Sequence, residues 1–163
     1  MRPLFVPILL LAWVSPAAAQ PDPPIHVPPA EVVTGLTVEH KGAGAIAAIS
    51  GNLTRNIGIL SEVGTSVDGV SLLAGARVGT TFYYDGKPPV PGRFFAQIMA
   101  GRQTGKAATA GAIVQPGAGG DVILVPSRGL SLHYSIDYRF MPGAPPYRSG
   151  ARFVVGLLIG PHT

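Results

Sequence analysis

Three polar residues at alternating positions, His133, Ser135 and Asp137, are of the types that form a hydrolytic triad. A nucleophile and its base must lie about 2.6–3.2 Å apart to transfer a proton. Residues two positions apart in a strand are separated by about 6.5–7 Å, because each strand residue advances the chain by about 3.3 Å. We therefore expect these side chains to pack and hydrogen-bond on one strand face, and we expect no enzymatic activity.

The sequence also lacks the usual patterns for metals and cofactors. It contains no Cys, and its four histidines show no i, i+4 spacing of the kind that places two ligands on one helix face. The glycine-rich segments 42–51 and 117–122 do not open a helix in a βαβ unit, as a phosphate loop would. We expect neither a metal nor a cofactor. The histidines are His26, His40, His133 and His162.

The elements that carry these polar residues are predicted to be strands. In 130–140 (LSLHYSIDYRF), apolar and polar residues alternate without a fault, which is typical of a strand with two different faces. Weaker alternation recurs along the chain, with Leu60, Phe95 and Met99 as apolar residues on otherwise polar faces. The expected strands are 33–40, 43–53, 56–67, 71–83, 92–103, 111–125, 128–140 and 149–160.

The polar faces of these strands indicate a barrel whose polar side points inward. They are crowded with glycine, which fits a narrow lumen with room for little side-chain volume. The few charges recur on the same faces, where they could pair, since an unpaired buried charge is costly. We predict an all-β, eight-stranded antiparallel up-and-down transmembrane β-barrel. The candidates for a lumenal ion-pair network are Glu62, Arg77, Asp121, Asp137, Arg139 and Arg152.

The first residues predict export. Arg2 precedes an apolar run at 4–14, and three alanines at 17–19 offer a cleavage site before Gln20. The next segment is rich in proline, which fixes φ and removes a backbone donor, so it is expected to be an extended linker. The predicted division is 1–19 signal peptide, 20–32 linker and 33–160 barrel domain.

Composition supports a membrane location and excludes some partners. Charged residues make up 12% of the chain and the mean hydropathy is +0.35, although no long apolar run follows the signal. Apolar surface delivered in alternation is typical of strands that face lipid. The net charge is +4, but no basic run is present, so no nucleic-acid partner is expected.

The order of the segments resembles a known family. The segments are GAGAIAAISGNLTRNIGILSEVG, LLAGARVG, RFFAQIMAGRQTG, GAGGDVILVPSRGLSLHYSIDYRF and GARFVVGLLIG. Together they resemble the small outer-membrane β-barrel domain proteins of acidobacterial type, which are similar to porin and OmpA-like barrels. The resemblance covers about 33–160. Such barrels commonly end on an aromatic residue that the insertion machinery recognises, whereas this sequence ends on Thr163.

The leading hypothesis is a cell outer-membrane barrel of Gram-negative type with a narrow or plugged lumen, in a structural or interaction role or as a very limited pore. It would contact outer-membrane lipid and, during biogenesis, the barrel-insertion machinery, as a monomer. The alternative is a soluble periplasmic β-barrel that binds a small apolar ligand; a third hypothesis is a lumenal hydrolase that needs His133. Aromatic girdles are expected at both rims. Their members would be Phe82, Tyr83, Tyr84, Phe94 and Phe95 at one rim and Tyr138 and Phe140 at the other.

Overall fold

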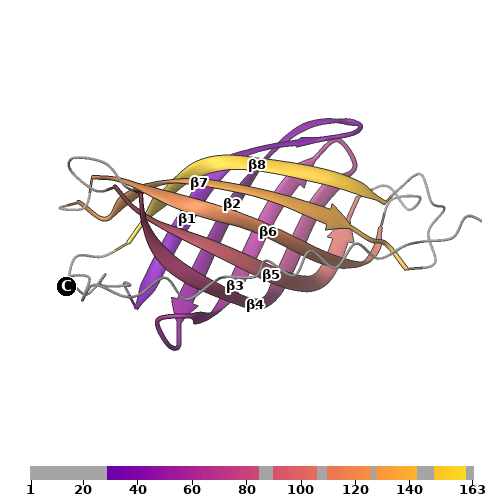
Figure 1. The fold of residues 1–163 in the computed structure, drawn as a ribbon. Helices are drawn as coiled ribbons and strands as arrows, with labels where there is room; N and C mark the ends of the chain where they lie inside the picture. Colours follow the sequence, from indigo (N-terminus) through magenta and orange to yellow (C-terminus); the bar gives the residue numbers. More distant parts are fainter. Residues whose placement is uncertain (1–28, 85–89, 106–109, 126–127, 143–148, 161–163) are drawn as a thin grey trace, which may run out of the picture.

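The computed structural model describes residues 29–84, 90–105, 110–125, 128–142 and 149–160, and the side chains of 83, 84 and 90 lie outside the description. Eight strands pair antiparallel in sequence order, and β1 pairs with β8 to close a barrel (Figure 1). The predicted all-β antiparallel barrel is therefore confirmed. The strands are β1 Ala30–Glu39, β2 Gly42–Asn52, β3 Ile57–Ser66, β4 Gly69–Tyr84, β5 Val90–Thr104, β6 Gly111–Val125, β7 Leu130–Arg139 and β8 Gly150–Ile159.

Within the described residues, no helix is long and apolar enough to cross a membrane. The predicted signal peptide at 1–19 lies outside the described residues, as does most of the predicted linker. The end of that linker belongs to the barrel, because β1 begins at Ala30 and not at 33. Glu31 is opposite Ser50 on β2, and Val32 is opposite both Ile49 and Ile159. The proline-rich composition stops at Pro29, so the backbone donors needed for strand pairing resume with the next residue.

The two ends of the barrel carry different connections. The terminal end holds the start of β1, the end of β8 and the links after β2, β4 and β6. The distal end holds the links after β1, β3, β5 and β7, of which the first two are tight turns at 40–41 and 67–68. Gly69 closes the second turn with φ +131°, and a Cβ there would lie 2.0 Å from the carbonyl oxygen of Thr104. Only glycine fits such a position without strain.

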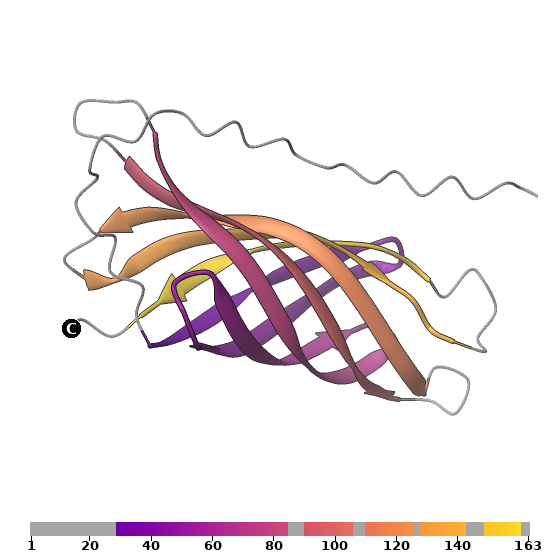
Figure 2. The same cartoon turned by 60° about the horizontal axis from the view of Figure 1, so that its bottom comes forward.

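The β4–β5 hairpin extends past its neighbours at the terminal end. β3 accompanies β4 only as far as Val78, and β6 accompanies β5 only from Gly92. Beyond these points the two strands pair with each other alone, and their ends separate from the neighbouring strands in Figure 2. The link between the strands expected at 71–83 and 92–103 is therefore shorter than predicted, since β4 ends at Tyr84 and β5 starts at Val90. Pro91 is tolerated there because only β4 needs its backbone groups.

The barrel closes through glycine. Gly35 on β1 and Gly156 on β8 are directly opposite each other at the closing pair of strands. A Cβ on Gly156 would lie 2.3 Å from the carbonyl oxygen of Thr34 and 2.8 Å from the Cα of Gly35. A Cβ on Gly35 would meet the Val155 carbonyl at 2.6 Å. The seam between the first and last strands thus depends on two residues without side chains.

Because side chains alternate along each strand, polar side chains line the inner face of the barrel wall and apolar side chains cover its outer face. In β7, every second residue from Ser131 to Arg139 is buried, and the residues between them are exposed apolar or aromatic side chains. The apolar residues that interrupt the predicted polar faces lie inside. They belong to interior surfaces that also hold two apolar clusters, one of Leu60, Leu73, Met99, Ile113 and Met141, the other of Val33, Ile46, Val154 and Leu158.

Candidate functional site

The barrel interior holds a group of ion pairs near the terminal end, here called the terminal network. Glu31 Oε2 accepts hydrogen bonds from Nη2 of Arg77 at 2.8 Å and from Nη2 of Arg93 at 2.9 Å. Arg93 also donates to Asp121 Oδ2, from Nε at 2.8 Å and from Nη2 at 2.6 Å. The members are Glu31, Ser50, Arg77, Arg93, Asp121 and His133, and all are buried.

Two further contacts complete the terminal network. His133 Nδ1 lies 2.7 Å from Asp121 Oδ1, so this carboxylate is shared between the imidazole and Arg93. The hydroxyl of Ser50 lies 2.9 Å from Arg77 Nη2 and 3.2 Å from Glu31 Oε2. Phe95 stacks on the His133 ring with a centroid distance of 5.4 Å, and the Arg77 guanidinium lies 5.3 Å from the centre of the Phe95 ring. The Phe95 ring therefore packs against both the His133 imidazole and the Arg77 guanidinium of this network.

A second group, the distal network, is centred on Arg152. Its Nη1 and Nη2 donate to the two carboxylate oxygens of Glu62, with an Nη2–Oε2 distance of 2.9 Å. Nη2 also donates to Asp137 Oδ2 at 2.9 Å. Gln97 Nε2 donates to the other oxygen of Asp137 at 2.9 Å. Bidentate guanidinium–carboxylate pairs are among the strong hydrogen-bonded arrangements of side chains, and only 1% of Arg152 is exposed.

Arg139 extends the distal network toward the distal end. Its Nη1 lies 3.1 Å from Glu39 Oε1, and its Nε donates to Gln115 Oε1 at 3.3 Å. Glu39 ends β1 and Gln115 lies in β6, so Arg139 of β7 links two strands that are not neighbours. Each arginine inside the described barrel thus lies within 3.1 Å of a carboxylate oxygen.

The six residues singled out from the sequence are all buried in the interior, but the structure divides them. Glu62, Asp137 and Arg152 form one cluster of direct contacts. Arg77 and Asp121 belong to the terminal network and are joined through Glu31 and Arg93, not to each other. Arg139 pairs with Glu39, which sequence reasoning had not selected.

Sequence reasoning also missed the residues that join these pairs. Glu31 was assigned to the proline-rich linker, so its place on an inward strand face was not considered. Arg93 lies next to Gly92 and Pro91, where the alternation of β5 is just beginning. The available signal was the alternation along β5, because Arg93 and Gln97 lie on the same face of the strand as Gly101, and glycine crowds the faces that were predicted to point inward.

The side chains with a triad-like composition form no nucleophile–base pair. Ser135 Oγ donates to Asp137 Oδ2 at 3.3 Å, and His133 contacts Asp121 instead of Ser135. Within the described residues, no group of three or more His, Asp or Glu side chains could hold a metal ion. An interior cavity of about 20 Å³ lies between the two networks, lined by polar side chains such as Ser50, Glu62 and Gln97 together with apolar ones. That volume accommodates about one water molecule.

Comparison with solved structures identifies the architecture. The chain is similar to the N-terminal β-barrel domain of Pseudomonas aeruginosa OprF, with a TM-score of 0.50 and 11% sequence identity, over 80% of this chain and 95% of that one. The fold is that of the OprF barrel domain. No protein-family model and no curated protein matches the sequence. At this identity the likeness to OprF establishes the fold alone.

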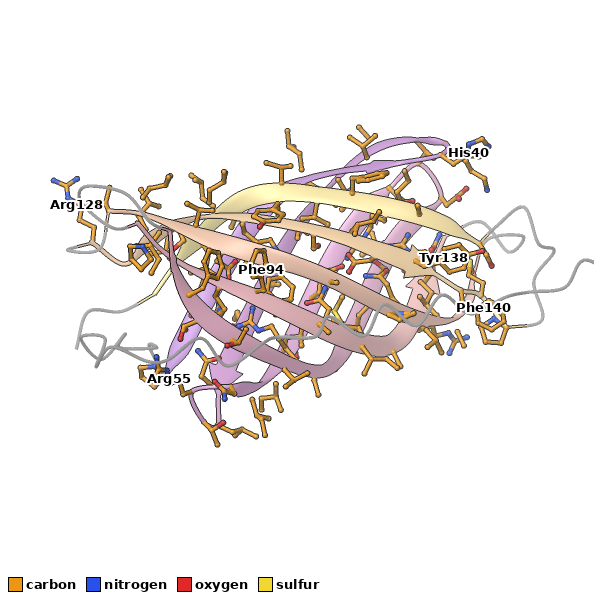
Figure 3. The ribbon with its side chains drawn as sticks, viewed as in Figure 1. His40, Arg55, Phe94, Arg128, Tyr138 and Phe140 are labelled. Carbon is orange, nitrogen blue, oxygen red and sulfur yellow. The ribbon has the colours of Figure 1, made fainter. Side chains whose placement is uncertain are left out.

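Aromatic side chains lie on the outside of this OprF-like barrel, toward its ends. Tyr138 and Phe140 are exposed at the distal end, on the same side as His40 (Figure 3). Phe94 lies on the outer wall and stacks on Phe82 with ring centroids 4.3 Å apart. Phe95 does not join the predicted girdle. It points into the barrel and is 4% exposed, because it has the opposite parity to Phe94 on β5.

Proposed function

We propose that this chain is an integral outer-membrane protein, with a lumen closed by ion pairs, that serves a structural or interaction role without enzymatic activity. The observation that carries the proposal is the inverted distribution of side chains. Large apolar residues such as Leu36, Ile49, Leu72 and Val155 are exposed on the outer wall, while all the charged strand residues except Arg102 turn their side chains to the interior. A protein surrounded by water places these classes the other way round.

Closure of the lumen is supported by the reach of the ion pairs. Glu62 of β3 meets Arg152 of β8, and Glu31 of β1 meets Arg77 of β4, so each pair bridges walls that are not adjacent. The strands on either side add cross-strand partners, as at Asp137 and Arg152. Side chains that meet across the barrel in this way support a lumen without a continuous aqueous path at these levels. The proposed protein is therefore an anchor or interaction module, not an open pore.

The alternative, a soluble barrel with a small apolar ligand inside, has less support. Ligand pockets commonly enclose about 300 Å³ or more. The interior cavity between the networks measures about 20 Å³ and is partly lined by Glu62, Arg77 and His133. A lumenal hydrolase would need a nucleophile beside His133. The side chain that contacts the His133 imidazole is the carboxylate of Asp121. The acidobacterial type and the monomeric state stay predictions from the sequence.

Fractionation of cells that produce the full chain tests the proposed location. The wild-type protein is expected in the outer-membrane fraction and to need detergent for release. Ile136→Arg places a charge on the outer face of β7, which costs about 2–4 kcal/mol if the site lies near the bilayer midplane, so insertion should fall sharply. Leu53→Arg makes the same exchange in the exposed turn after β2 and should still insert. Recovery of the wild-type protein in the soluble fraction without detergent would refute the proposal.

A further inference from the structure

One charged side chain on the strands points outward. Arg102 of β5 is exposed, whereas every other charged residue of the described strands has a side chain that is turned to the interior. On an apolar outer wall that faces lipid, a charged side chain is destabilising unless it finds a polar partner or lies near water. The inward-facing charged residues are Glu31, Glu39, Glu62, Arg77, Arg93, Asp121, Asp137, Arg139 and Arg152.

The strands around Arg102 supply no counter-charge. Its cross-strand neighbours are Leu72 on β4 and Ala112 on β6. Thr104, the next outward residue along β5, already donates its hydroxyl to the Val70 carbonyl at 3.2 Å. The acids nearest the distal end are engaged elsewhere, Glu39 with Arg139 and Asp68 with Lys41. The sequence has no Asp or Glu from 101 to 120 or from 140 to 149, so the links nearby cannot provide one.

The position of Arg102 along the barrel fits an interface between membrane and water. β5 ends at Thr104, only two residues further toward the distal end. Tyr138 and Phe140 are exposed on the outer wall at the same end, where aromatic residues of membrane barrels mark the interface (Figure 3). An outward arginine is costly at the midplane of the bilayer but is tolerated at little cost near the interface. The distal end of β5 is therefore a place where this cation is tolerated.

We infer that Arg102 binds the phosphate group of an anionic lipid headgroup in the leaflet at the distal end of the barrel. A guanidinium presents two parallel N–H donors that match two phosphate oxygens, and this geometry also fixes the depth of the barrel in the bilayer. A zwitterionic headgroup offers the same phosphate with a compensating cation, so an anionic lipid is favoured. This inference depends on the proposed membrane location and adds a specific partner to it.

Lipid retention by the purified, full-length barrel tests this inference. The barrel is reconstituted in phosphatidylcholine bilayers that contain phosphatidylglycerol, released in neutral detergent and weighed by native mass spectrometry. Arg102→Gln is expected to bind phosphatidylglycerol about fivefold more weakly than wild type, the factor that corresponds to about 1 kcal/mol per basic residue at an anionic surface. Arg102→Lys keeps the charge without the fork and should fall between the two. Arg128→Gln, an exposed cation at the terminal end, should bind as wild type does.

Two results would overturn the inference. One is equal phosphatidylglycerol retention by wild type and Arg102→Gln. The other is displacement of the bound lipid by millimolar inorganic phosphate, which would show recognition of a free anion and not of a headgroup. Folding of each variant is checked by the faster migration of an unheated barrel on an SDS gel. If wild type and Arg102→Gln both fractionate with membranes while lipid retention is equal, this inference fails and the proposed location stands.

Discussion

At the scale of single residues, Arg152 has the most demanding environment. It is 1% exposed and holds two carboxylates, Glu62 from across the lumen and Asp137 from the neighbouring strand. Its removal would leave two acidic groups close together without a cation. Breaking a buried ion pair from one side is costly because the remaining charge is no longer compensated.

We predict that Arg152→Met destabilises the folded barrel by about 3–5 kcal/mol, measured by urea unfolding in detergent micelles. The triple variant Arg152→Met, Glu62→Gln, Asp137→Asn should recover part of that loss, since no buried carboxylate is then left without its cation. Arg128→Gln, at an exposed position, should change stability by no more than about 0.5 kcal/mol. A loss below about 1 kcal/mol for Arg152→Met would mean that the cluster contributes little.

Sequence reasoning at this scale selected two members of the terminal network, Arg77 and Asp121, and four of the distal network, Glu62, Asp137, Arg139 and Arg152. Four of these residues lie on strands with clear alternation, so the alternation alone predicted that their side chains point inward. They are Asp121, Asp137, Arg139 and Arg152. Their partners depend on which strands meet across the lumen. Glu31 and Arg93 are 62 residues apart in the chain, and their contact follows from the tilt and closure of the whole barrel. The local sequence pattern of each strand does not indicate which residues of distant strands come into contact.

At the scale of elements, neighbouring residues of one strand have opposite environments. Leu73 is 1% exposed and packs in an interior apolar cluster, while Leu72 is 62% exposed on the outer wall. The same residue type therefore tests the two faces of β4 side by side.

Leu73→Ala is expected to destabilise the barrel by about 2–5 kcal/mol, because it leaves a cavity in a packed cluster. Leu72→Ala should cost less than about 1 kcal/mol, since lipid or detergent chains fill the space that the side chain leaves. Thermal unfolding followed by circular dichroism in the same micelles compares the two variants. Equal losses would contradict the assignment of the faces.

The closing seam gives a second prediction for the elements. Gly156→Val should prevent β8 from approaching β1, because even a Cβ at this position would overlap the Thr34 carbonyl. We expect the variant to lose the fast-migrating band on an unheated SDS gel and to become sensitive to protease. Gly150→Ala is the matched control on the same strand, since a Cβ there meets nothing within 4 Å. A fully folded Gly156→Val barrel would disprove the need for glycine at the seam.

The strands themselves were largely predictable, and their ends were less so. β6 begins and ends at the predicted 111 and 125, and β7 and β8 differ from their predicted ranges by one or two residues at each end. β1 and β5 begin earlier than expected, at Ala30 and Val90. In both cases proline lies just before or inside the strand start, and it suggested a loop. A strand end that pairs on one side only tolerates proline, and pairing is not visible in the sequence.

At the scale of the whole molecule, the interior determines whether the barrel conducts. Ion pairs of the terminal and distal networks cross the lumen at two levels, and the cavity between them measures about 20 Å³. We predict that the wild-type protein produces no steady, discrete conductance in planar bilayers at neutral pH. The matched control is the detergent buffer carried through the same reconstitution, and insertion is verified by protease protection. Stable single-channel steps from the wild-type protein would exclude a closed lumen.

The position of Arg152 on the last strand has a consequence for biogenesis. Glu62 and Asp137 are made before β8 and receive their common cation only when the final strand joins the wall. A sheet that lacked β8 would carry these two acids without their common cation on the face that becomes the lumen. Partly assembled forms are therefore disfavoured, and assembly is expected to be all-or-none. We expect these ion pairs to favour the complete barrel over partly assembled forms, since only the complete barrel brings the three side chains together.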